Sequence, residues 1–542
     1  MMQHKKTFYL FFLSLLGFSF PGITQSSFQS NWIRHFGNNG YDHLSVTELD
    51  DENSMYLAGF FYDSLEQLSA KGASDIYLRK VDSLGNTVWL LGMGGNADDR
   101  VLDMFFDTYQ QRILLTGYFS DSILFQGQTI YAHAFEDVFL ISLDKEGNLQ
   151  WLRSFEGNGS EAANTISSNQ RGDIVIGGYY DEQIILGTDT LDDTGLRSTF
   201  LSLLDSAGQV IKSFSILGNS VDEPKSVIYD IHGSIYCTGY FRDTIQMADS
   251  TLCASGLHDV FLGCFDQNLN LKWVNKIHSI HQDRSSDIEW MPMAQKIVLS
   301  GDFMGVLQIG DTSLVSNIDE QVYIAIFDTT GQLDFAFQFG SLYAETSHDI
   351  CIDHLDRIYC VGTFDSVIVF GQDTFIAKHY NAPTDFYCFQ FDKEGNLLRG
   401  LSGGGLLNDF GFYVNVTDSG KLYLSGLFNQ HLYLFSDSLT SFGNYDVFLV
   451  ELNPDYFLST ESFQKDTYLK VFPNPSHYSI QVELPSLDLP FSYQIYTWEG
   501  KLYKNSISCQ NMILVNDLPM GKYILLIQNQ NFTYKSKLII HE

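Results

Sequence analysis

Residues 137–151 read "DVFLISLDKEGNLQW", and this stretch decides the fold because close copies of it recur along the chain. The copies begin at Asp75, Asp137, Ser198, Asp259, Gln321, Asp385 and Asp446. Successive copies start about 61 residues apart. A fixed period of this length is typical of a repeat architecture, in which each unit packs against its neighbours.

Each repeat contains a second recurring element, a strand that ends in a glycine, which an aromatic residue follows in the first four repeats (Phe60, Tyr118, Tyr179 and Tyr240). This glycine is found at Gly59, Gly117, Gly178, Gly239, Gly301, Gly362 and Gly426. A further strand and a turn precede it, as in "TISSNQRGDIVIGGYY". Together with the two strands of the opening stretch, each unit supplies four strands. Seven four-stranded units predict an all-β fold, a seven-bladed β-propeller.

The two ends of the repeat region complement each other. A lone tryptophan strand, Trp32–Phe36, begins the region, and Asp446–Asn453 ends it without a tryptophan partner. Each end therefore supplies the strand that the other lacks. We expect these N- and C-terminal strands to pair and close the ring, which would leave no open sheet edge.

The charged residues Asp144, Lys145 and Glu146 of the opening stretch raise the question of a chemical site. In five of the seven copies, an aspartate and a glycine recur three residues apart, while the residues between them vary. The aspartate can accept hydrogen bonds from turn amides, and the glycine can adopt the positive φ of a bulged hairpin. Chemistry would need fixed residues between the two, so the pattern predicts a turn.

The motif D-[VI]-[FY]-L, then D-x-x-G-N, then a tryptophan and an acidic loop, resembles the SBBP-type and related bacterial propeller repeats. The resemblance covers Trp32–Asn453. It implies the propeller fold but no particular function, because propellers of this kind serve many roles.

An acidic residue follows the tryptophan position by ten or eleven residues in every repeat. These residues are Asp42, Asp99, Glu161, Asp222, Asp283, Glu345 and Asp409. A ring of carboxylates on one face could bind a cation such as calcium, or a basic partner. Alternatively, each carboxylate accepts hydrogen bonds within its own blade, and the regularity of the pattern favours this second interpretation.

Composition limits the partners and the compartment. The chain of 542 residues has 65 acidic and 31 basic residues, a net charge of -34, which disfavours binding to nucleic acid or anionic membranes. Residues 1–26 read as a secretory signal peptide, with Lys5 and Lys6 before the apolar run Phe8–Phe20. That run is too short to cross a bilayer, and no other run is long enough, so we expect no membrane span.

The repeats stop at Asn453, and residues 454–467 form a polar linker. Residues 468–542 read as alternating strands of a small immunoglobulin-like β-sandwich. They resemble the type A C-terminal sorting domain of the type IX secretion system, although Thr497 stands where that family usually has Asp or Asn. The matching residues are Pro473, Asn474, Pro475, Gly500, Lys501, Leu518, Gly521, Tyr523, Lys535 and Lys537.

The resemblance of the tail implies contact with the type IX secretion machinery and passage through the periplasm and outer membrane. It also implies later removal of the tail, and attachment to surface lipopolysaccharide or release. The chain is thus expected to be a secreted or cell-surface protein of the Bacteroidetes type.

No catalytic motif is recognised in the sequence, so no catalytic residue is assigned. We expect residues 28–453 to form a non-catalytic propeller that binds protein or glycan, with recognition on the face that carries the most varied loops. The alternative is a secreted hydrolase or lyase acting on polysaccharide, with acidic residues at the channel mouth. Apart from calcium at the acidic ring, no cofactor is expected.

Overall fold

The computed structural model describes residues 29–193, 196–316, 319–341, 343–370, 373–377, 384–435, 437–453, 470–476, 478–483, 491–497, 502–508, 512–528 and 533–541. The predicted signal peptide and linker lie outside these residues. The chain divides into two compact units, Met1–Asp455 and Tyr456–Glu542. Every element of the described residues is a β-strand, so the all-β class is confirmed.

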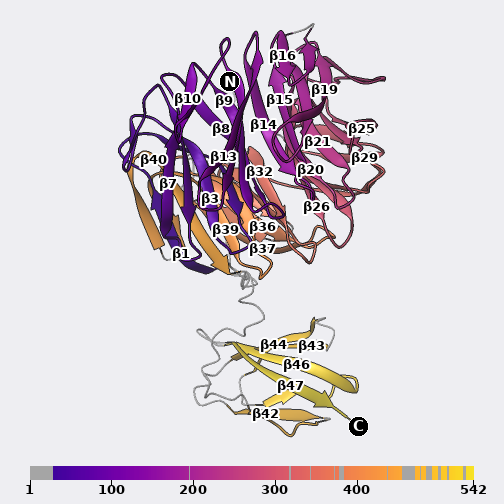
Figure 1. Cartoon of the computed structure of the whole chain (residues 1–542). Coiled ribbons are helices and arrows are strands. Elements are labelled where there is room, and N and C mark those ends of the chain that lie inside the picture. The colour runs from indigo at the N-terminus through magenta and orange to yellow at the C-terminus, as the bar shows by residue number, and fades with distance from the viewer. Residues whose placement is uncertain are drawn as a thin grey trace, which may run out of the picture. The chain divides into compact units, whose positions relative to one another are not determined.

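The first unit is built from sheets with four main antiparallel strands each, which is how propeller blades are made (Figure 1). In six of these sheets the strands follow chain order. These sheets are β2 (Asp42–Leu49), β3 (Met55–Phe61), β6 (Asp75–Val81) and β7 (Thr87–Met93); β8 (Asp99–Asp107), β9 (Arg112–Phe119), β12 (Asp137–Asp144) and β13 (Leu149–Gly157); β14 (Glu161–Ser168), β15 (Ile174–Tyr180), β18 (Ser198–Leu204) and β19 (Val210–Gly218); β20 (Glu223–Tyr229), β21 (Ile235–Phe241), β24 (Asp259–Phe265) and β25 (Leu271–His278); β26 (Asp283–Met291), β27 (Lys296–Phe303), β30 (Gln321–Phe327) and β31 (Leu333–Phe339); and β32 (Glu345–Ile352), β33 (Ile358–Phe364), β36 (Asp385–Phe391) and β37 (Leu397–Gly403).

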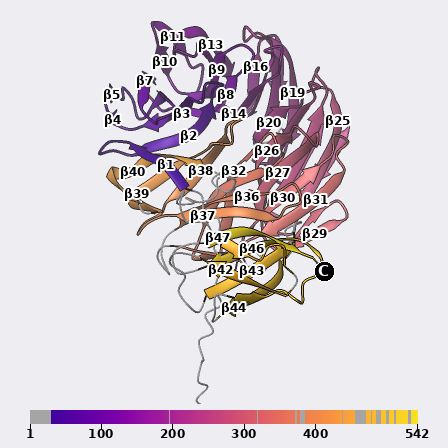
Figure 2. The same cartoon turned by 90° about the horizontal axis from the view of Figure 1, so that it is seen from below.

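The remaining sheet joins both ends of the unit. Its strands are β38 (Phe410–Val416), β39 (Leu422–Leu434), β40 (Asp437–Asn453) and β1 (Gln29–Phe36). β1 pairs antiparallel with β40, with Ile33 opposite Val450. Figure 2 shows the indigo β1 beside the orange β39 and β40. The predicted pairing of the two end strands is therefore present.

The first strands of consecutive sheets contact one another: β2 with β8, β8 with β14, β14 with β20, β20 with β26, β26 with β32, β32 with β38, and β38 with β2. Each of these strands has a β-bulge at the same place, which interrupts its own ladder. Side chains beside the bulge reach the next sheet. Thr165 Oγ1 accepts a hydrogen bond from the backbone N–H of Val227 at 3.0 Å, and Asp349 Oδ2 accepts one from that of Val414 at 2.8 Å.

Short hairpins provide a second link between sheets. The hairpin of β16 (Gln183–Leu186) and β17 (Asp189–Asp192) pairs with β13 of the preceding sheet. The same occurs with β22 (Thr244–Met247) and β23 (Ser250–Cys253), and with β28 (Val306–Ile309) and β29 (Thr312–Val315). The connector between the second and third strands of these repeats thus contains a hairpin that extends the preceding sheet.

Further hairpins of this kind are β4 (Ser64–Leu65) with β5 (Leu68–Ser69), β10 (Ser122–Phe125) with β11 (Gln128–Tyr131), and β34 (Val367–Phe370) with β35 (Asp373–Ile376). Apolar side chains fill the space between successive sheets. One such cluster joins Leu140 of β12, Ile176 of β15 and Phe200 of β18. The core of the first unit is therefore a series of layers between sheets.

The second unit contains two antiparallel sheets. One is made of β41 (Lys470–Phe472), β42 (Ser479–Glu483) and β45 (Met512–Leu514), and the other of β44 (Leu502–Ser508), β43 (Phe491–Thr497), β46 (Gly521–Gln528) and β47 (Thr533–Ile540). Ile480, Ile495 and Leu525 belong to one core shared by both sheets. This arrangement of two sheets over a common core is that of a β-sandwich.

Candidate functional site

The charged segment of the opening stretch is a turn between β12 and β13. Asp144 Oδ1 accepts hydrogen bonds from the backbone N–H groups of Glu146 at 3.0 Å and Asn148 at 2.8 Å. Gly147 has a φ of 83°, which an L-residue adopts only with strain. The turn interpretation is confirmed, and the Asp144 carboxylate is occupied by its own turn.

The seven acidic residues of the predicted ring lie at the start of the first strand of their sheets. Asp42 is 1% exposed, and the other six side chains are 0% exposed. The Asp42 carboxylate accepts a hydrogen bond from the backbone N–H of Asn38 at 2.7 Å, and Asp99 accepts one from Gly95 at 2.7 Å. The geometry agrees with the hydrogen-bonding interpretation. The structure spaces these residues around successive sheets and does not gather them into one site.

The other five ring carboxylates also accept a hydrogen bond from a backbone N–H group. The donor lies in the preceding loop or at the end of the second strand. The backbone donors are Gly159 for Glu161, Arg242 for Asp222, Ser279 for Asp283, Ser341 for Glu345 and Asn429 for Asp409. Burying a carboxyl group is unfavourable unless it is hydrogen-bonded or protonated. These bonds hold the start of each sheet in place.

Sequence reasoning missed a second set of side chains that face the ring. In six sheets they are the first residues of the third strand, each 24 positions before a ring residue: Asp75, Asp137, Ser198, Asp259, Gln321 and Asp385. In the closing sheet, Asp446 on β40 is the equivalent residue, and it lies near Asp42. A Cβ placed on Gly340 would lie 2.6 Å from Glu345 Oε2 and 2.8 Å from Gln321 Cγ. Both members of that pair therefore converge on the glycine that follows β31. The signal was present, because these residues begin the repeated motif.

Burial raises the pKa values of the ring carboxyl groups toward neutral pH or above it. Burial, with the nearby Asp446 carboxyl as a smaller cause, raises the pKa of Asp42 to about 7. Burial and Asp137 raise the pKa of Glu161 to about 8, and burial and Asp385 raise that of Asp409 to about 8. Each pair thus carries less than its full negative charge.

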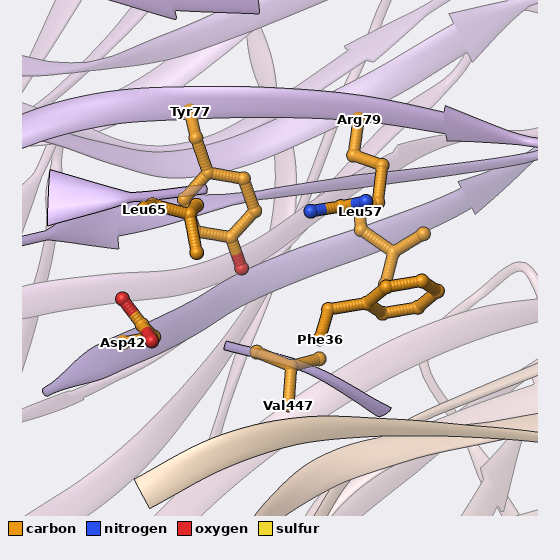
Figure 3. Close-up of a pocket in the computed structure, with 7 residues that line it drawn as sticks. All are labelled: Phe36, Asp42, Leu57, Leu65, Tyr77, Arg79 and Val447. Carbon is orange, nitrogen blue, oxygen red and sulfur yellow. The ribbon is translucent and has the colours of Figure 1, made fainter. Parts of the chain in front are cut away.

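A small cavity adjoins one member of the ring, where the closing sheet meets the first repeat (Figure 3). It is lined by Phe36, Asp42, Leu57, Leu65, Tyr77, Arg79 and Val447. Asp42 Oδ1 and the Tyr77 hydroxyl are buried and have no hydrogen-bond partner. Because the cavity is small and two polar atoms on its wall lack partners, it suits one bridging water molecule and not an organic ligand. Within the described residues, no group of three or more His, Cys, Asp or Glu side chains is placed to hold a metal ion.

A different group of side chains lies on the same face, and we call it the rim. It consists of the residue that follows each ring residue, the residue opposite it on the second strand, and the neighbouring aromatic and charged side chains that contact these two. The pairs in register are His43 with Phe60, Arg100 with Tyr118, Ala162 with Tyr179, Glu223 with Tyr240, Arg284 with Asp302, Thr346 with Thr363, and Phe410 with Leu427. The tyrosines and arginines of the rim are half-buried, whereas Phe60, Ala162, Asp302, Thr363 and Leu427 are buried. The aromatic residues after the recurring glycine were the sequence signal for the rim. Sequence reasoning used that signal only to count repeats.

The described residues of the sorting motif have structural contacts in the second unit. Asn474 Oδ1 accepts a hydrogen bond from the backbone N–H of Ile539 at 2.9 Å, which joins the Pro-Asn-Pro segment to β47. The Tyr523 hydroxyl donates to the backbone oxygen of Pro519 at 2.8 Å. Leu518 is buried, Gly521 begins β46, and Lys535 and Lys537 lie on β47. Gly500 and Lys501 lie outside the described residues.

The two units together define a class of protein: an all-β repeat protein with a C-terminal sorting signal. Residues 470–541 match the family model described as "Secretion system C-terminal sorting domain". This match confirms the recognition of the tail. The tail marks the chain for export to the cell surface or secretion through the outer membrane. In the described part of the chain, no helix has the length and apolar character needed to cross a membrane.

Other comparisons give distant likenesses. The "Uncharacterized WD repeat-containing protein L264" of Acanthamoeba polyphaga mimivirus is 22% identical over 503 residues, with 74% of this chain and 36% of that protein covered. The chain thus spans well under half of that relative's length.

Solved structures also resemble the chain. PorZ, a surface component of the type IX secretion system of Porphyromonas gingivalis, is 9% identical, covers 92% of this chain and 81% of its own, and has a TM-score of 0.21. A DUF4221 family member from Bacteroides vulgatus is 9% identical, with coverages of 78% and 97% and a TM-score of 0.31. At TM-scores this low, neither likeness carries an argument.

Proposed function

We propose that the sheets up to Asn453 form one closed seven-bladed β-propeller. The support is the contact of β38 with β2 and the pairing of β1 with β40. A closed ring also leaves no sheet edge open to pairing with other chains, which suits a protein that folds after export. The resemblance of the repeats to SBBP-type propellers favours the same arrangement.

We propose further that this propeller is a non-catalytic protein that binds glycan or protein, secreted or displayed on the cell surface. The observation that carries the proposal is the rim. Tyr118, Tyr179 and Tyr240 are half-buried side chains that present aromatic surface beside charged groups on one face. Aromatic and polar side chains that converge on a rigid sheet scaffold are the usual composition of a binding site.

The alternative, a polysaccharide hydrolase or lyase, needs two carboxyl groups that reach the substrate. Asp283 and Glu345 of the acidic ring would have to serve in this role, and both side chains are 0% exposed. They therefore give the alternative no support. After export, the tail would be removed, and the propeller would be attached to surface lipopolysaccharide or released, as the resemblance of the tail implies.

The test is binding of the purified propeller to glycan arrays and to surface proteins. We expect reproducible binding to at least one class and no turnover of a polysaccharide panel. Product release from any polysaccharide, lost in an Asp283→Asn or Glu345→Gln variant that still folds, would support the hydrolase alternative instead. A folded protein that binds nothing on either array would contradict the proposed function.

A further inference from the structure

Contacts between rim side chains join neighbouring sheets, as between Arg100 and Phe60 and between Arg197 and Glu223. In the closing sheet and the first repeat the rim is aromatic: Tyr41 lies 5.5 Å from Tyr445 and 6.0 Å from Tyr62, between ring centroids. His43 stacks on Phe60 at 4.5 Å. This half of the rim offers ring surface with few charges.

In the following repeats the rim becomes a series of aromatic rings and cations. The Arg100 guanidinium lies 4.5 Å from the Phe60 centroid, so it joins the first repeat to the second. Arg197 lies 3.8 Å from the Tyr179 centroid, and the Lys225 ammonium lies 5.1 Å from the centroid of Tyr240. Cation–π contacts of this kind fix the orientation of both partners.

Each cation of the rim also has a carboxylate partner. Arg100 lies 3.1 Å from Asp98, and Arg197 lies 3.0 Å from Asp181. Lys225 lies 3.1 Å from Glu223. The positive and negative charges of these pairs cancel, although the chain as a whole has a net charge of -34.

The pairing of these charges favours an uncharged ligand over a charged one. A strongly charged ligand would have to break an ion pair to gain a partner, and the group left behind would be costly to bury. An uncharged ligand with hydroxyl groups keeps the pairs intact. It can donate to the carboxylate and accept from the guanidinium of the same pair. Its C–H faces can pack on the aromatic rings.

The limited exposure of the rim tyrosines favours a sugar ligand over a protein partner. Binding hot spots for proteins are large anchors that enter pockets of the partner. The rim tyrosines Tyr118, Tyr179 and Tyr240 are only half-exposed, whereas Tyr109 and Tyr131, outside the rim, are 59% and 70% exposed. Half-buried rings of this kind cannot act as protruding anchors, but their exposed faces can pack against a sugar ring.

We propose that the rim binds an uncharged oligosaccharide, with the tyrosines packing on sugar rings and the ion pairs hydrogen-bonding to hydroxyl groups. This inference rests on the proposed function of ligand binding, and it names the ligand class and the side chains. Arg100 and Tyr118 form the subsite at the second repeat, and Arg197 and Tyr179 form that at the third.

The test uses the full chain and isothermal titration with hexasaccharides of glucose, mannose and galactose. Hexagalacturonate serves as the acidic probe of equal length. We expect binding to at least one uncharged hexasaccharide and weaker binding to the acidic one. Replacing Tyr118 by alanine should weaken this binding by about tenfold, because one aromatic contact is lost.

Tyr109→Ala is the matched control, because Tyr109 lies in the turn at the other end of the β8–β9 hairpin. It should bind like the unchanged protein. Tyr118→Phe keeps the ring and should retain most of the affinity, which separates loss of contact from loss of folding. Equal losses in Tyr118→Ala and Tyr109→Ala would overturn the placement at the rim.

The remaining outcomes separate this inference from the proposed function. Binding only to hexagalacturonate, or only to a protein on the array, would overturn the uncharged-sugar proposal and leave the binding function standing. Binding to no probe, glycan or protein, would overturn both.

Discussion

The paired acidic residues at the start of the sheets explain how a chain with a net charge of -34 can bury so many carboxyl groups. In two repeats one partner is neutral by nature: Ser198 faces Asp222, and Gln321 faces Glu345. In the other repeats a proton can serve the same purpose, because a protonated carboxyl group is as uncharged as a hydroxyl or an amide. The pair position therefore tolerates at most one full negative charge.

This leads to a pH dependence with a definite sign. Burial raises the pKa of Asp99 to about 7 and that of Glu345 to about 8, well above the values of unfolded carboxyl groups near 4. Between these values the folded state binds more protons than the unfolded state, so the free energy of unfolding falls as pH rises. We expect a melting temperature several degrees lower at pH 8.5 than at pH 5, measured by calorimetry. A melting temperature that rises over this range would contradict the protonated pairs.

A single amide should reduce this dependence. Asp75→Asn copies the neutral partner that Gln321 supplies in its own repeat. We expect Asp75→Asn to flatten the pH profile and to gain stability at pH 8.5 relative to the unchanged protein, since it removes a charge from the pair with Asp99. Asp82→Asn, at an exposed turn, is the control and should leave the profile unchanged. Equal profiles for all three proteins would argue against charge pairing.

A glycine that packs against a ring carboxyl group, such as Gly157 against Glu161, should not tolerate a larger residue. A Cβ on Gly157 would meet the Glu161 carboxyl group, while a Cβ on Gly127 would meet nothing within 4 Å. We expect Gly157→Ala to lower the free energy of unfolding by about 2–3 kcal/mol, because a buried carboxyl must move. Gly127→Ala, whose φ is 82°, should cost only about 1 kcal/mol. Urea denaturation measures both, and an equal effect would show that the Glu161 carboxyl group can move at little cost.

At the scale of elements, the sequence predicted the repeating strands well because the period and the turn residues act locally. The D-x-x-G turns and the pairing of β1 with β40 follow from residues a few positions apart, or from the missing strand at each end. The acidic pairs and the rim depend instead on which strands lie side by side. Arg100 and Phe60 come from different repeats, and the order of residues does not reveal their contact.

The closing sheet gives a prediction at this scale. Deleting Gln29–Phe36 removes β1 and leaves the outer side of β40 without its partner. We expect the deletion to lower the melting temperature of the whole first unit and to promote aggregation, because an unpaired edge strand invites association. The control is a chain that begins at Gln29 and therefore keeps β1. Light scattering during thermal unfolding reports both effects, and an unchanged melting temperature would show that β1 is dispensable.

At the scale of the whole molecule, the two units divide the work. The second unit carries the sorting signal, and its Pro-Asn-Pro segment is joined to the last strand by Asn474. The first unit carries the acidic pairs and the rim. Both features of the first unit depend on successive sheets staying side by side, so the central claim is that these sheets form one closed ring.

The measurement that tests this claim most directly is a double-mutant cycle between Thr47 on β2 and Asn415 on β38. Thr47 Oγ1 donates to Asn415 Oδ1 at 2.8 Å, although the two residues are 368 positions apart. The free energies of unfolding of Thr47→Val, Asn415→Ala and the double variant give the coupling between the first and last repeats. The closed ring predicts a favourable coupling of about 1 kcal/mol. Strictly additive effects would contradict closure, because in an open array of sheets these residues would not meet.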